Sequence, residues 1–335
     1  GWQTFTLLVK NEPFTPDEIA RLRAFLTERS FDAGYYPGMR REEANRYNVL
    51  DAPYFFDGAT ALLGENPRAF MADYKFNLRP ATDDRPYFDN FFKWSSLPEQ
   101  LALHGESGYP LAERGYLILL ATLAQALPIA LLLIVAPLPF LRRRASSGRT
   151  RALVYFAALG LAFLFIEIAS IQRFALFLGH PLYAVALVLA SFLIFAGLGA
   201  AASGAAARFF AKLAPVPPIM LIAAGVAELA IIYMFALPSL FDGLLAAAAW
   251  IKIAVSVALI APLAFLMGMP FPLGLGALAS REPALAPWAW GINGCASVLS
   301  PVLATLLAIH WGFSVVIALA AGLYGVAAAS APRQA

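Results

Sequence analysis

The sequence predicts a mainly α-helical, polytopic membrane protein: a bundle of about seven spans over residues 114–335, preceded by a small α/β extramembrane domain over residues 1–113. Three observations lead to this fold class. Of the 335 residues, 60% are hydrophobic and only 13% are charged, whereas soluble domains carry about 25% charged residues. From residue 116 onward, apolar runs recur that are as long as the ~20 residues a helix needs to cross the hydrocarbon layer. Charge is also segregated, with a net charge of −5 over residues 1–113 and +8 over residues 114–335.

The extramembrane domain is expected to begin with a strand, because residues 2–9 alternate and are rich in strand-forming side chains. A helix should follow, capped by Thr15, with Pro16 at its first position and Glu18 three residues after the cap. Residues 31–38 then form an aromatic strand ending in a turn. Residues 40–51 are expected to be helical at the surface, and residues 54–94 to be an ordered loop rich in aromatic side chains.

The transmembrane bundle is expected to follow the apolar runs in order. The predicted spans are residues 116–140, 152–174, 182–207, 218–238, 246–267, 288–309 and 312–330. Basic residues flank alternate ends of these spans, namely Arg142, Arg143, Arg144, Arg149, Arg151, Arg208, Lys212, Arg281 and Arg333. Since loops rich in arginine and lysine stay in the cytoplasm, these loops are expected to be cytoplasmic and residues 1–113 periplasmic, in a bacterial inner membrane.

This placement has consequences for partners and for chain length. The lipid bilayer is the expected partner, while the basic residues flank apolar segments and form no face that could follow a nucleic acid. An N-terminal periplasmic domain needs a signal peptide or a preceding span, and one strand with one helix cannot close a core. We therefore expect the sequence to be part of a longer protein.

Glycine and proline patterns in the spans predict packing and breaks. The series Gly197, Gly199 and Gly204 resembles a nucleotide loop, but it lies in an apolar run, where small residues let helices approach closely. Two prolines and three glycines over residues 267–276 should break the fifth span. The break is either a cytoplasmic turn or a re-entrant element lining a cavity.

Charged residues inside the spans are the most specific candidates for function, because each costs about 2.5–3.5 kcal/mol to insert near the bilayer centre. They are Glu167, Glu228 and Lys252. Glu167 and Lys252 should lie at similar depth and are expected to pair, with Arg173 at the outer rim. A buried ion pair, a polar pathway for protons, ions or polyamine, and contact with a partner subunit all remain open.

Other polar residues are weaker candidates. Asn293 and Ser297 lie four residues apart on the sixth span and are expected to form hydrogen bonds between helices. His104, His180 and His310 fall on the predicted periplasmic side but lack the paired spacing of metal ligands, and the single cysteine, Cys295, builds no zinc site. No metal site is therefore predicted. The series Asp83, Asp84 and Arg85 could bind a cation or a polyamine, or could simply form a local turn.

Three segments carry a resemblance to a known family: residues 80–88 (PATDDRPYF), residues 165–174 (FIEIASIQRF) with 179–183 (GHPLY), and residues 287–294 (PWAWGING). There the sequence resembles the bacterial multi-spanning spermidine-synthase-like membrane proteins. The resemblance implies a methyltransferase-type Rossmann domain beside membrane helices and aminopropyl transfer from decarboxylated S-adenosylmethionine to putrescine. Residues 1–94 would match only the tail of such a domain.

The cofactor site of that family is not visible in this sequence. A nucleoside site of the Rossmann type needs a glycine-rich turn after a strand and an acidic partner for the ribose, and residues 1–94 contain neither. We therefore expect no cofactor in this chain, and an S-adenosylmethionine-type cofactor only in an upstream domain. No catalytic residue is assigned.

Three functions remain open from sequence alone. The chain could be the membrane-embedded part of a spermidine-synthase-like enzyme whose nucleotide site lies upstream. It could be a non-catalytic accessory or scaffold subunit of a larger membrane complex. It could also be a transporter-like protein with a polar pathway around its intramembrane charges.

Overall fold

The computed structural model describes residues 6–98, 114–135 and 149–332. The chain divides into two units: Gly1–Arg79 with Phe91–Tyr109, and Pro80–Asn90 with Pro110–Ala335. The short segment Pro80–Asn90 thus belongs to the helix bundle, although the chain on both sides of it belongs to the first unit.

The first unit is helical and irregular. Its helices are α1 (Pro16–Glu28), the 3-10 turn η1 (Arg41–Glu43), α2 (Tyr54–Leu63), α3 (Pro67–Asp73) and η2 (Trp94–Ser96). The predicted capping box of α1 is confirmed: the Glu18 N–H donates to Thr15 Oγ1 at 3.3 Å, and the Thr15 N–H donates to Glu18 Oε2 at 2.8 Å.

The predicted α/β character of this unit is not shown. Over the residues that the structure describes, neither residues 6–9 nor residues 31–38 form a strand. An extended segment becomes a strand only when a neighbour satisfies its backbone groups, and here none lies alongside. The region expected to be loop instead contains α2 and α3, while residues 40–51 contain only the turn η1.

Polar side chains take the place of a sheet in holding the first unit together. The Asp32 carboxylate accepts the backbone N–H groups of Arg46, Tyr47 and Asn48 at 2.6, 3.0 and 2.6 Å. Burial acts to raise the pKa of Asp32, but these hydrogen bonds outweigh it and the pKa is lowered. Lys93 Nζ donates to three carbonyl oxygens at the end of α3, those of Met71, Ala72 and Tyr74.

The second unit contains seven helices that are long and apolar enough to cross a membrane, within the described residues. The bundle is built from α5 (Arg114–Val135), α6 (Arg149–Leu178), α7 (Pro181–Leu213), α8 (Pro218–Gly243), α9 (Ala249–Met267), α10 (Pro270–Arg281), α11 (Ala286–Trp311) and α12 (Phe313–Ser330). The 3-10 turn η4 (Pro283–Leu285) joins α10 to α11, and α9 with α10 forms one candidate span. The coarse prediction of a seven-span helical bundle is confirmed.

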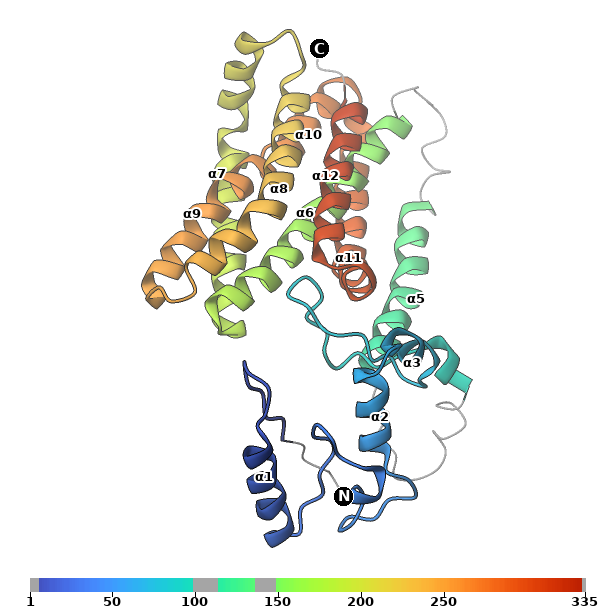
Figure 1. Ribbon diagram of the computed structural model, residues 1–335. Helices are drawn as coiled ribbons and strands as arrows, with labels where there is room; N and C mark the ends of the chain where they lie inside the picture. Colours follow the sequence, from blue (N-terminus) through green and yellow to red (C-terminus); the bar gives the residue numbers. More distant parts are fainter. Residues whose placement is uncertain (1–5, 99–113, 136–148, 333–335) are drawn as a thin grey trace. The chain divides into compact units, whose positions relative to one another are not determined.

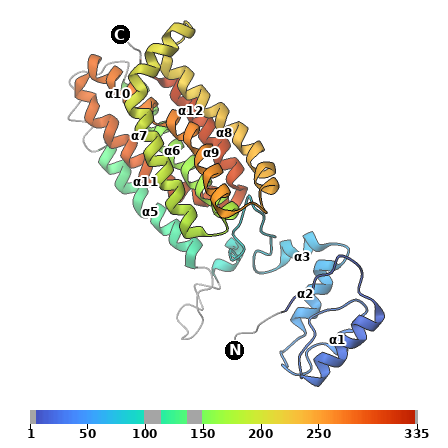
Figure 2. The same ribbon diagram turned by 90° about the vertical axis from the view of Figure 1, so that its left-hand side faces the viewer.

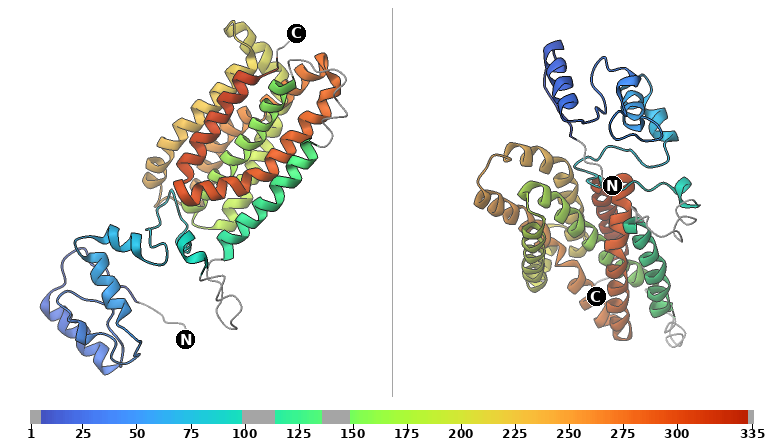
Figure 3. Two further views of the ribbon diagram at one scale, coloured as in Figure 1. Left: turned by 90° about the vertical axis from the view of Figure 1, so that its right-hand side faces the viewer. Right: turned by 90° about the horizontal axis from the view of Figure 1, so that it is seen from below.

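Helix α6 lies at the centre of the bundle and is the most enclosed of the seven spans, whereas α5 is the least enclosed. It packs against α11, α12 and α7, and α5 lies along the outside of α11 (Figures 2 and 3). Large side chains fill the centre: Tyr155, Phe156, Phe192 and Tyr324 are all at most 1% exposed.

Small residues set the closest helix contacts, as the glycine pattern predicts for a helix–helix interface. A Cβ on Gly199 of α7 would overlap the Phe265 carbonyl oxygen of α9, and one on Gly268 would overlap the Ala196 carbonyl oxygen. The expected break at residues 267–276 is a tight bend between α9 and α10, and the Pro270 carbonyl oxygen there accepts a hydrogen bond from the Tyr155 hydroxyl.

Candidate functional site

A cluster of polar groups lies where α6 ends and α12 begins. Gly312 lies between α11 and α12 with φ +93°, a left-handed conformation that favours glycine. It turns the chain so that α12 starts immediately, leaving the first N–H groups of α12 without partners inside the helix. These N–H groups create a site for an acceptor.

Asp84 occupies this site. Its carbonyl oxygen accepts the Phe313 N–H at 2.9 Å, and its Oδ1 accepts the Ser314 N–H at 2.8 Å and the Ser314 hydroxyl at 2.7 Å. A carboxylate at a helix N-terminus is also favoured by the helix dipole. Asp84 therefore caps α12 from a distant segment of the chain.

Arg173 of α6 completes the cluster. Its Nη2 donates to Ser314 Oγ at 2.9 Å and lies 3.5 Å from Asp84 Oδ1, while its Nη1 donates to the Met234 carbonyl oxygen at 3.4 Å. The side chain of Arg173 is 10% exposed and that of Asp84 is 38% exposed. Arg173 is the enclosed partner, so removing Asp84 would leave the buried guanidinium without its counter-charge, which is more costly than breaking a surface pair.

The segment that carries Asp84 is shaped by a local turn. The Arg85 N–H donates to the Thr82 carbonyl oxygen at 2.8 Å, and the Thr82 N–H returns a bond to the Arg85 carbonyl oxygen at 3.2 Å. Tyr87 packs on Phe313, with ring centroids 5.9 Å apart, and burial raises the pKa of Tyr87 to about 12. Asp83 is exposed. The backbone of residues 82–85 therefore forms a local turn, one of the two alternatives for this series, and Asp84 in addition contacts the bundle.

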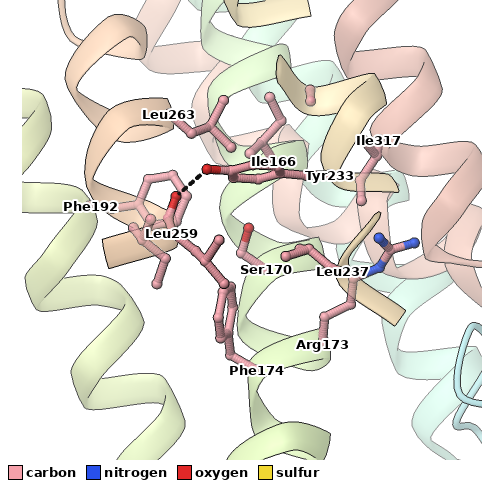
Figure 4. Close-up of a pocket in the computed structure, with 12 residues that line it drawn as sticks. Ile166, Ser170, Arg173, Phe174, Phe192, Tyr233, Leu237, Leu259, Leu263 and Ile317 are labelled. Carbon is pink, nitrogen blue, oxygen red and sulfur yellow. Dashed lines mark hydrogen bonds between the residues drawn. The ribbon is translucent and has the colours of Figure 1, made fainter. Parts of the chain in front are cut away.

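Arg173 also lines a small cavity in the bundle (Figure 4). Its volume is about 20 Å³, enough for one water molecule. It is bounded by α6, α7, α8, α9 and α12, and most of its lining is apolar. Its polar side chains are Ser170, Arg173 and Tyr233, and the Tyr233 hydroxyl donates to the Leu259 carbonyl oxygen at 2.9 Å.

The three predicted intramembrane charges do not come together. Among the residues that the structure describes, Glu167 forms no ion pair or hydrogen bond, although it is only 7% exposed. Lys252 Nζ lies 5.5 Å from the centroid of the Phe177 ring, a cation–π contact. The expected pair between Glu167 and Lys252 is absent, and Glu228 is exposed on α8.

The remaining candidates lie elsewhere in the bundle. Asn293 Nδ2 donates to the Phe156 carbonyl oxygen at 3.1 Å and so joins α11 to α6. His310 Nε2 and the Tyr116 hydroxyl are 2.9 Å apart and join α11 to α5. The His180 ring lies edge-on to the Tyr183 ring. The other predicted residues lie outside the described residues: His104, Arg142, Arg143, Arg144 and Arg333. Within the described ranges, no cluster of three or more histidine, cysteine or acidic residues could hold a metal ion.

The chain was compared with protein-family models, with curated proteins and with solved structures. None of the three comparisons gave a match.

Sequence reasoning missed the partners of Asp84. Ser314 and Gly312 carry no charge and looked like ordinary residues at the start of the last span. The sequence did carry a signal for the break between α11 and α12, because a glycine directly after an apolar helical run is typical of a helix end, but it carried none for Asp84 as the acceptor.

Proposed function

We propose that the chain is the membrane-embedded part of a spermidine-synthase-like membrane protein, and that its helix bundle acts as a non-catalytic scaffold for an extramembrane unit. The family part of this proposal rests on the resemblance of residues 80–88, 165–174, 179–183 and 287–294, and the observation that carries the scaffold role is the attachment of Pro80–Asn90 to the bundle by Asp84. This segment is continuous with the first unit at Arg79 and Phe91. Its backbone and carboxylate bind α12, and Arg173 of α6 holds the same carboxylate.

The proposal includes a location in the bacterial inner membrane, with the cluster on the periplasmic side. Arg151, at the start of α6, donates to the Ala329 carbonyl oxygen near the end of α12. Asp84 binds the start of α12, so Arg151 and Asp84 lie at opposite ends of the bundle. Figure 1 shows the end of α7, with Arg208 and Lys212, at the same end of the bundle as Arg151. Positive charge at one end supports a cytoplasmic assignment for it.

A transporter-like pathway is the second candidate function. The buried Glu167 favours it, because an unpaired carboxyl group inside a span is usually functional. The close packing of α6, α7 and α9 through glycine favours the scaffold instead, since it builds a rigid centre.

Hydrogen exchange measured by mass spectrometry tests the attachment that the scaffold needs. In Asp84→Ala, peptides covering residues 80–90 and 311–318 should exchange faster, because the N–H groups of Phe313 and Ser314 lose their acceptors. Asp83→Ala is the matched control, since Asp83 is exposed and should leave both peptides unchanged. Unchanged exchange in Asp84→Ala would show that Asp84 does not hold this segment to the bundle.

A further inference from the structure

Glu167 is the least explained polar group in the bundle. It lies in the middle of the most enclosed helix, and it is only 7% exposed. Along α6, one turn on either side, its neighbours are the apolar Phe163, Leu164 and Ile171 and one polar residue, Ser170. A bare carboxylate in such surroundings costs several kcal/mol, whereas the neutral acid costs far less.

No positive charge within the described residues compensates Glu167. The charged groups of the neighbouring helices are engaged or distant: Arg173 binds Asp84 and Ser314, and Lys252 lies over Phe177. Arg151 binds the Ala329 carbonyl oxygen at the far end, where Arg208, Lys212 and Arg281 also lie. Of the other titratable side chains on α6 and the helices around it, Tyr155 donates to the Pro270 carbonyl oxygen, Tyr233 donates to the Leu259 carbonyl oxygen and His310 contacts Tyr116. Tyr183 lies against His180, Cys295 is a half-buried free thiol and Tyr324 is buried, while Glu228 and Asp242 are exposed on α8.

Two polar residues lead from Glu167 toward the Asp84 end of the bundle. Ser170 lies one turn farther along α6 and Arg173 one turn beyond that, each step rising about 4.5 Å. Both side chains line the one-water cavity, and Figure 4 shows the Ser170 hydroxyl in the space between Tyr233 and Phe174. Arg173 then reaches Asp84, whose side chain is 38% exposed. The series Glu167, Ser170, Arg173 and Asp84 thus runs from the bundle centre toward its end: Ser170 and Arg173 line the cavity, Arg173 contacts Asp84, and Glu167 lies one turn before Ser170, outside the cavity lining.

We propose that Glu167 is a proton-binding site, neutral at pH 7, that exchanges its proton with the Asp84 end of the bundle through Ser170 and a water molecule in the cavity. On release, the O–H bond of the Glu167 acid breaks and its electron pair stays on the carboxylate. Because Glu167 makes no hydrogen bond to the residues that the structure describes, its side chain must first turn toward Ser170, one turn along α6; the Ser170 oxygen then accepts this proton and passes its own proton to the water, which leaves as hydronium. Serine can do so because its hydroxyl both donates and accepts.

Infrared spectroscopy of the full chain in proteoliposomes tests the bound proton. At pH 7 the spectrum should contain the carbonyl stretching band of a protonated carboxylic acid, shifted to lower frequency in D₂O. The band should disappear in Glu167→Gln, whose side chain has nearly the same shape, and remain in Glu228→Gln, the matched control on α8. A wild-type spectrum without this band, or a band that persists in Glu167→Gln, would overturn the proposal.

The exchange route needs its own measurement. The shift of the Glu167 band after transfer to D₂O should become about tenfold slower in Ser170→Ala, the change produced by ~1.4 kcal/mol added to a barrier. Ser256→Ala is the control, because Ser256 is a buried serine on α9 that bonds only its own helix at the Lys252 carbonyl oxygen. An unchanged rate in Ser170→Ala would exclude this route.

Discussion

Gly312 is the residue on which the Asp84 cluster depends most directly. Its φ of +93° is one that side chains with a Cβ rarely adopt, and a Cβ there would overlap Asp84 Oδ2. A single backbone position thus determines both the direction of α12 and the room for its acceptor. No other residue type meets both requirements.

Gly312→Ala should therefore destabilise the bundle by about 1–3 kcal/mol through backbone strain, with a further loss from displacing Asp84. Thermal unfolding in detergent measures the change. Gly322→Ala, on α12, is the control, because a Cβ there has open space and alanine favours a helix. Equal stability of the two variants would mean that the turn adjusts without cost.

In the first unit, the carboxylate of Glu43 is held in its charged form by neighbouring side chains. The hydrogen bond from the Tyr36 hydroxyl holds the pKa of Glu43 at about 2, against an ordinary value of 4.5, and Arg23 and Arg40 also contact the carboxylate. Because the folded pKa is lowered, the carboxylate stabilises the folded unit fully above pH 4.5. This stabilisation is lost as the pH falls from 4.5 toward 2.

Acid should accordingly loosen the first unit over this range, and Tyr36→Phe should start the loss at a higher pH. Pepsin is active in acid and cleaves loosened segments, so the loss of structure is measured as pepsin cleavage within residues 6–79, mapped by mass spectrometry on the full chain. Tyr35→Phe is the control, because Tyr35 contacts Phe56 by its ring alone. An onset unchanged by Tyr36→Phe would show that its hydroxyl does not stabilise the carboxylate.

At the scale of elements, the α7–α9 crossing depends on direct backbone contact. Gly199 and Gly268 each meet a carbonyl oxygen of the opposite helix, so neither interface has space for a methyl group. Pro262 lies inside α9 and Pro270 at the first position of α10, and both helices pack against α7. Packing here depends on shape and needs no polar contact.

Gly199→Ala should cost about 1–3 kcal/mol, because the added methyl group forces the helices apart. Gly197→Ala, two residues earlier on the same helix, meets nothing within 4 Å and should leave stability unchanged. Comparing the two thermal midpoints in detergent separates packing at the crossing from the general effect of alanine. A neutral Gly199→Ala would contradict the close approach.

At the scale of the whole molecule, the proposed topology predicts opposite accessibility for two exposed residues. Cysteines at Asp83 and Ser280, each in a Cys295→Ser background, should react with a membrane-impermeant maleimide from the periplasmic and the cytoplasmic side respectively. Spheroplasts and inverted vesicles present the two sides. Labelling of both positions from one side would exclude the proposed orientation.

The sequence predicted the spans well, because crossing a membrane imposes a local requirement on length and polarity that any 20-residue window reveals. It predicted poorly which side chains contact one another. Lys252 was expected to meet Glu167 but lies over Phe177 instead, and Asp84 bonds Ser314, 230 residues away. Such contacts depend on which helices are neighbours, and apolar helices of similar composition do not encode that order locally. The strands predicted at residues 6–9 and 31–38 do not form for the same reason, because a strand requires a neighbouring strand.

The attachment of Pro80–Asn90 to the bundle also determines how the chain would behave once cut. The backbone passes between the two units after Arg79, after Asn90 and after Tyr109. A single cleavage between residues 91 and 109 would leave the N-terminal fragment held by Asp84, Tyr87 and their contacts at the start of α12. The two fragments would migrate separately under denaturing conditions and together under native ones, as the halves of a complemented split protein do.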